Sequence, residues 1–135
     1  MNTRLIRLAG LVLCASLAGA PAVADMHGEA ESNSGIYRVG YTSRVAEPAL
    51  NVMHEWILTV RTEAGDPVEN AEITVDGGMP AHNHGLPTAP RVTEYLGDGQ
   101  YRVRGFRFHM RGDWQVSFEI RESDRSDTVT FDLTL

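Results

Sequence analysis

Apolar and polar residues alternate along most of the chain after residue 35, with the two-residue period that is typical of half-buried β-strands. The alternation is clearest in Ile36 to Thr42, Val52 to Arg61 and Trp114 to Ile120. Shorter segments with the same character complete the set: 71–75, 91–96, 100–104, 106–110 and 128–133. In the longest segment one face would carry Val52, His54, Trp56, Leu58 and Val60.

Turn signals separate these segments at short and regular intervals. Ala64 to Pro67 contains Gly, Asp and Pro, and Gly97-Asp98-Gly99 is typical of a tight hairpin. No segment after the first 24 residues has the 3.6-residue period of a helix. The pattern therefore predicts an all-β fold, an immunoglobulin-like antiparallel β-sandwich of seven to eight strands.

The first 24 residues have a different character from the rest of the chain. Arg4 and Arg7 precede an apolar run, and Ala22-Val23-Ala24 has the small-x-small pattern of a cleavage site. We therefore expect a secretory signal peptide over residues 1–24 and a periplasmic location for the mature protein. The alternative is a lipoprotein anchored through Cys14, although the preceding Leu13 is bulky for a lipid-attachment box.

Two further regions follow the signal peptide. Residues 25–35 are polar and small without periodicity, which predicts a flexible amino-terminal arm. Residues 36–135 are expected to form one β-sandwich domain, and we expect no membrane span in the mature protein.

The charge and composition of the mature region exclude several functions. The signal holds two of the 12 basic residues and none of the 18 acidic ones, which leaves a mature net charge of −8. This acidity, without a basic cluster, argues against nucleic acid or an anionic membrane as a partner. The one cysteine lies in the signal, so the mature chain has no disulfide and no thiolate. Because catalytic motifs such as Gly-x-Ser-x-Gly and His-Glu-x-x-His are also missing, we expect no enzyme.

Methionine and histidine occur together in the mature region, where every Met lies within three residues of a His. Thioether sulfur favours Cu(I) and imidazole accepts either copper state, so the pairing favours copper as the ligand. The most compact set is Met79, His82 and His84, in a predicted loop from Asp76 to Pro90. In an extended segment the two histidines project from one side and could share an ion.

A second group of candidate ligands is His109 with Met110. If 106–110 is a strand, Met110 faces the core and only His109 is free, unless the following Arg111-Gly112-Asp113 turn twists the strand end. Met53 is expected to pack, and His54 is expected to be a half-buried residue near a strand end.

A possible separate metal site lies at the amino terminus. Cleavage after Ala24 would expose Asp25-Met26-His27. The free amine, two backbone amides and the imidazole of His27 would then offer the square-planar nitrogen set that Cu(II) and Ni(II) prefer.

The stretch from about Asn51 to Ile120 resembles the YtkA-like (FixH-like) domain of exported bacterial proteins. The most specific part joins a Met-Pro-x-His-x-His loop to a Phe-x-Met-x-Gly-x-Trp strand. The resemblance rests on Asn51, Trp56, Gly65 to Ala71, Met79 to Gly85, Gly99-Gln100-Tyr101, Phe108-His109-Met110 and Gly112-Asp113-Trp114. It implies an immunoglobulin-like sandwich outside the cytoplasm and a link to copper handling or respiratory-complex maturation.

Carried onto this chain, the resemblance places family-like Met and His residues at Met79, His82, His84, His109 and Met110. Some relatives have Met where this chain has His, which leaves the metal and its oxidation state open. The first reading is a periplasmic copper chaperone or sequestering protein, with a periplasmic or membrane-bound copper or haem protein as its candidate partner. The alternative is a metal-free accessory or assembly module for a membrane or haem respiratory complex.

A third reading is a zinc- or copper-dependent enzyme, for which the sequence supplies no obvious base. The distance between the His84 and His109 imidazoles would best decide whether the two segments form one metal site. Two ligands of one ion lie within about twice a metal–nitrogen bond of ~2 Å.

Overall fold

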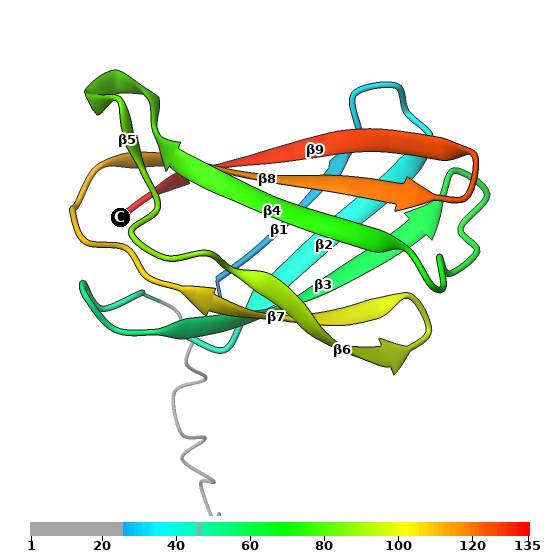
Figure 1. The fold of residues 1–135 in the computed structure, drawn as a ribbon, viewed down its shortest axis with the longest axis horizontal. Coiled ribbons are helices and arrows are strands. Elements are labelled where there is room, and N and C mark those ends of the chain that lie inside the picture. The colour runs from blue at the N-terminus through cyan, green and yellow to red at the C-terminus, as the bar shows by residue number, and fades with distance from the viewer. Residues whose placement is uncertain (1–25, 46) are drawn as a thin grey trace, which may run out of the picture.

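Two antiparallel sheets pack face to face in the computed structural model, which describes residues 26–45 and 47–135 (Figure 1). Sheet A has the strand order β1–β2–β3–β7–β6, and sheet B has the order β5–β4–β8–β9. The strands are β1 Met26–Glu31, β2 Tyr37–Ser43, β3 His54–Thr62, β4 Glu72–Met79, β5 His84–Gly85, β6 Arg91–Gly97, β7 Gln100–Phe106, β8 Asp113–Glu122 and β9 Arg125–Thr134. The expected all-β, immunoglobulin-like sandwich is confirmed, with nine strands in the described residues rather than seven or eight.

The core lies between the sheets and is built from the alternating large residues of the strands. Trp56 is at its centre, fully buried and stacked between Tyr41 and Phe106, with ring centroids 4.4 and 4.2 Å away. His54, Leu58 and Val60, which were expected on the same face of β3 as Trp56, are also buried. Val52 was expected there too, but it is 49% exposed because β3 begins only at His54.

The expected flexible arm is wrong for residues 26–31, which form the edge strand β1. This strand pairs with β2 over its whole length, from Met26 opposite Ser43 to Glu31 opposite Arg38. Two of its three inward positions, Gly28 and Ala30, are small, and a Cβ at Gly28 would lie 2.6 Å from the Tyr41 ring. Small residues give a weak periodic signal, which is why the sequence pattern does not indicate this strand.

The predicted signal peptide, residues 1–24, lies outside the described residues. Within residues 26–45 and 47–135, no helix has the length and apolar character needed to cross a membrane.

The predicted loop from Asp76 to Pro90 is also partly wrong, because β4 continues through Gly77 and Gly78 to Met79. A single 3₁₀ turn, η1 (Pro80–His82), then leads into β5, which pairs back onto β4. A Cβ at Gly78 would collide with the carbonyl oxygen of His84, so glycine is needed where the two strands meet. This hairpin projects from one end of the sandwich (Figure 1).

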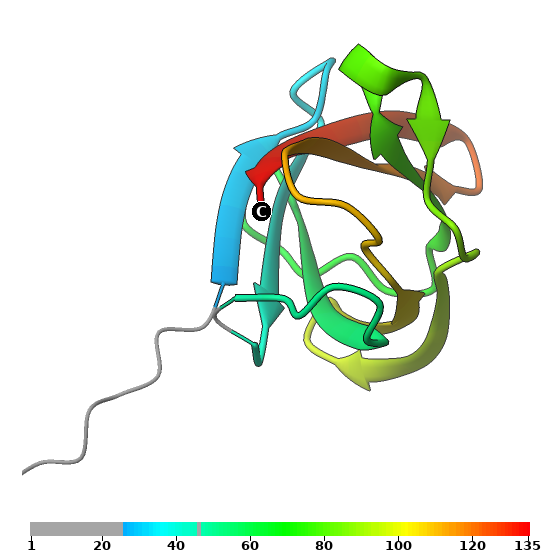
Figure 2. The same cartoon turned by 90° about the vertical axis from the view of Figure 1, so that its left-hand side faces the viewer.

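Asp127 fastens β9 to the turn between β1 and β2, on the side where β1 and β9 lie next to each other (Figure 2). Its buried carboxylate accepts hydrogen bonds from the backbone N–H groups of Ser34 (2.8 Å) and Thr128 (2.9 Å). Burial alone would raise the pKa of Asp127. Hydrogen bonds from Ser32, Ser34 and Thr128 outweigh burial, and the pKa falls below its ordinary value of 3.8.

Replacing Asp127 with alanine is expected to lower the free energy of unfolding by about 1–3 kcal/mol at neutral pH, because buried donors lose their acceptor. Since folding lowers this pKa, the stabilisation is complete above the ordinary value and disappears as the pH falls through the folded-state value. Urea unfolding of both proteins between pH 7 and pH 2 measures the difference. A stability gap that stays constant over this range would contradict the assignment.

Candidate metal centre

Two of the five histidines lie on the projecting hairpin between β4 and β5. His82 ends η1, His84 begins β5, and both are exposed. Asn83 between them has left-handed backbone angles (φ 52°, ψ 39°), a conformation that Asn adopts more readily than most residues. The ring centroids of His82 and His84 are 6.4 Å apart with nearly parallel planes. The hairpin therefore presents both imidazoles together, as the sequence predicts.

A third histidine comes from the segment that joins β7 to β8. The expected strand over 106–110 ends at Phe106, and residues 107–112 are irregular, although Phe108 stays buried. His109 is half-buried, and its ring centroid lies 6.0 Å from that of His84 at an interplanar angle of 87°. Two imidazoles on one ion have centroids roughly 5–6 Å apart, since each metal–nitrogen bond is about 2 Å. The two segments thus meet at a distance that one ion could bridge after a small side-chain movement.

Trp114, in β8, holds the 107–112 segment in place. Its Nε1 donates a hydrogen bond to the carbonyl oxygen of Met110 (3.0 Å), and its ring lies 5.4 Å from that of His109 in an edge-to-face arrangement. The Nδ1 atom of His109 is buried without a hydrogen-bond partner in the described residues. Buried polar atoms are nearly always partnered, so this nitrogen is one that a ligand could satisfy.

Sequence reasoning included Trp114 only as part of the family motif and missed its role as a support. The available signal was a tryptophan immediately after the Arg111-Gly112-Asp113 turn.

The methionines are arranged differently from the expectation. Met79 is only 1% exposed and belongs to the core, so the prediction that it is an accessible ligand is wrong about its exposure. Its methyl carbon lies next to the 107–112 segment, because a Cβ at Gly112 would come within 2.9 Å of it. Met110 is half-buried beside His109, and Met53, expected to pack, is 59% exposed.

The remaining histidines do not join this group. His54 is buried, and its Nε2 donates to the carbonyl oxygen of Ala49 (3.2 Å). His27 lies on the edge strand β1. Asp25, the first residue of the predicted amino-terminal metal site, lies outside the described residues. Among those residues, no three His, Cys, Asp or Glu side chains are grouped as a ready-made metal site. The candidate centre is therefore a pair of imidazoles, His84 and His109, with His82 and Met110 as their neighbours along the chain.

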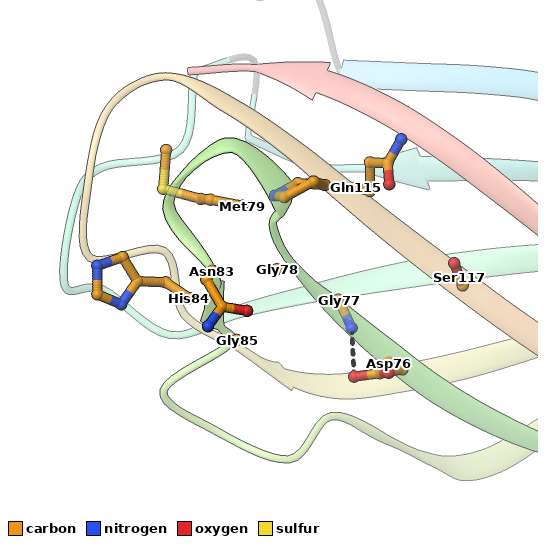
Figure 3. A pocket seen from close by; sticks show the side chains of 10 residues that line it. Asp76, Gly77, Gly78, Met79, Asn83, His84, Gly85, Gln115 and Ser117 are labelled. Carbon is orange, nitrogen blue, oxygen red and sulfur yellow. Dashed lines mark hydrogen bonds between the residues drawn. The ribbon is translucent and has the colours of Figure 1, made fainter.

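A hollow of about 320 Å³ lies beside His84, between the hairpin and β8. Gly77, Gly78 and Gly85 line it without side chains, and polar groups of Asn83, Gln115 and other residues surround it. His84 and Asp76 lie at opposite ends of the hollow (Figure 3), and the Asp76 carboxylate accepts a hydrogen bond from the N–H of Gly77 (2.8 Å). His84 can therefore be reached from solvent.

Comparison with known proteins gives two matches. The model of the YtkA-like family matches residues 38–119. Among solved structures, the crystal structure of a DUF4426 family protein from Pseudomonas aeruginosa PAO1 is similar, with a TM-score of 0.55 and 17% sequence identity. The match covers 80% of this chain and 94% of that protein, and at this identity it supports the fold alone. No curated protein matches the chain.

Proposed function

The chain belongs to the YtkA-like family, and from this premise we propose that it is a periplasmic copper-binding protein that carries or sequesters the ion rather than an enzyme. The observation that carries this proposal is the 6.0 Å separation of the His84 and His109 rings, which come from two different connections of the sandwich. His84 is exposed, and the buried Nδ1 of His109 has no hydrogen-bond partner among the described residues, so the pair combines an accessible imidazole with an unpartnered ring nitrogen.

The proposed ligand set is His84 and His109, with His82 and the Met110 thioether as further donors. Copper suits this set because imidazole binds both oxidation states and thioether favours Cu(I). The mature chain has no thiolate that would hold the ion more tightly. A site of two imidazoles near the surface keeps coordination positions open, so a partner protein could take the ion by exchanging ligands one at a time.

One observation favours the metal-free accessory module as a second candidate. Three of the five exposed large hydrophobic residues in the described chain, Val45, Val52 and Met53, lie in the connection between β2 and β3. This connection is tied to the histidine segment, because the N–H of Asn51 donates to the carbonyl oxygen of Phe108 (2.8 Å). An apolar loop beside the histidines is what a protein-docking surface would require.

Copper titration of the purified protein separates the two candidates. We expect uptake of one ion per chain at this centre, measured by isothermal titration for Cu(II) and by competition with a chromogenic chelator under nitrogen for Cu(I). On titration with Cu(I), the nuclear magnetic resonance signals of His84, His109 and the Trp114 indole should shift together. If the protein binds neither Cu(I) nor Cu(II) above background, the metal-free accessory module is the remaining candidate.

A further inference from the structure

A second hollow, of about 320 Å³, lies on the outer face of sheet A, across β1, β2 and β3. Its side chains come from adjacent strands: His27 and Glu29 from β1, Arg38 and Thr42 from β2, and Thr59 and Arg61 from β3. It is lined by none of the residues of the proposed copper centre.

The hollow surrounds Gly40, which lies in the middle of β2 directly between Glu29 and Thr59. Glycine in a strand interior is unfavourable and often marks a place where a ligand approaches the backbone. The neighbouring Gly28 has a packing reason, because a Cβ there would strike the Tyr41 ring. Gly40 has no such reason, since the nearest atom to a Cβ would be 3.6 Å away. The missing side chain therefore leaves space that packing does not demand.

Two guanidinium groups border this space from adjacent strands. Arg38 and Arg61 are directly opposite each other in the β2–β3 ladder, a position in which like charges destabilise a sheet. Within the part of the chain that the structure describes, the one ion pair of Arg38 is a long contact with Glu31 (3.7 Å), whereas Arg61 pairs with Asp98 (2.8 Å). An anion between the two arginines would relieve their repulsion.

Hydrogen-bond donors are also available at this position. The side-chain hydroxyls of Thr42 and Thr59 make no hydrogen bond within the described residues. Arg61 also donates a hydrogen bond to the carbonyl oxygen of Gly65 (3.2 Å), so Arg38, with its long ion pair, is the arginine more available to a ligand.

We propose that this hollow binds one oxyanion group, a carboxylate or a phosphate, over Gly40. Arg38 supplies the main charge contact, Arg61 supports it, and the hydroxyls of Thr42 and Thr59 donate hydrogen bonds. Arginine suits this role because its planar, permanently charged guanidinium matches the oxygen atoms of both anions. The site is independent of copper and of the histidine centre.

Isothermal titration of the purified, copper-free protein with inorganic phosphate and with acetate at low ionic strength tests the proposal. Saturable binding of phosphate alone supports a phosphoryl ligand, and binding of both anions supports any oxyanion. Gly40→Val should fill the hollow and weaken binding at least tenfold without lowering the melting temperature, because valine favours strands. Arg38→Gln should weaken binding similarly.

The matched control is Arg121→Gln, which removes an exposed arginine of sheet B that is paired with Glu119 (2.7 Å). This variant should bind phosphate as the unaltered protein does. The proposal is overturned if neither anion binds saturably, or if Gly40→Val binds as tightly as the unaltered protein. Since no copper is added, either result leaves the copper proposal unaffected.

Discussion

Replacing both His84 and His109 with alanine should weaken copper binding by about 100-fold or more, which corresponds to about 2.7 kcal/mol of binding free energy. Among residues 26–45 and 47–135, the two imidazoles are the only pair from separate segments whose rings approach to 6.0 Å, so their removal leaves His82 and Met110 as isolated donors. The fold should survive, since His84 is exposed and His109 half-buried. Competition titration gives the affinity, and thermal unfolding of the metal-free variant checks the fold.

Single variants sharpen this test. His84→Ala or His109→Ala alone should cause most of the loss, because two ligands of one ion act as a unit and their effects are not additive. His27→Ala is the matched control, because His27 lies on the edge strand β1 and not at the proposed centre. If that control loses copper while the double variant keeps it, the ion binds at the amino terminus and the present assignment is wrong.

Trp56→Ala should lower the free energy of unfolding by about 3–5 kcal/mol, the usual cost of emptying a large buried aromatic site. Its ring is fully buried and stacks on both Tyr41 and Phe106, so the cavity would lie at the centre of the core. Trp56→Phe should cost clearly less. The Nε1 atom of Trp56 is buried without a partner in the described residues, so phenylalanine removes no hydrogen bond.

Urea unfolding at neutral pH measures both variants, and Val52→Ala is a suitable control. Val52 is exposed in the connection that precedes β3, and its truncation should change stability by no more than about 0.5 kcal/mol. Equal losses for Trp56→Phe and Trp56→Ala would mean that the indole N–H has a partner after all.

Strands rich in large residues were predictable from the sequence, and those that use glycine were not. Tyr37, Val39 and Tyr41 show their period directly, and all three are buried. In β1 the inward positions include Gly28 and Ala30, which carry almost no hydrophobic signal. In β4 the Gly77-Gly78 pair suggested a loop, although both residues remain in the ladder with β8.

The error over Met79 follows from the same two glycines. Ile73 and Val75 pack against the core, and Met79 continues their alternation once the strand is extended. The proximity of His84 and His109 could not be predicted from the sequence, because it depends on the pairing of β4 with β8. That pairing brings the β4–β5 hairpin beside the segment that enters β8.

The histidines of the proposed centre all lie in connections between long strands, and β5, which begins with His84, pairs with β4 at two positions. The exposed positions of these connections can therefore be substituted with little loss of stability, whereas Phe108 and Met79 are part of the core. Ligand type can change over evolutionary time while the scaffold is retained. The YtkA-like fold of this chain therefore does not by itself determine which ion, if any, its connections bind.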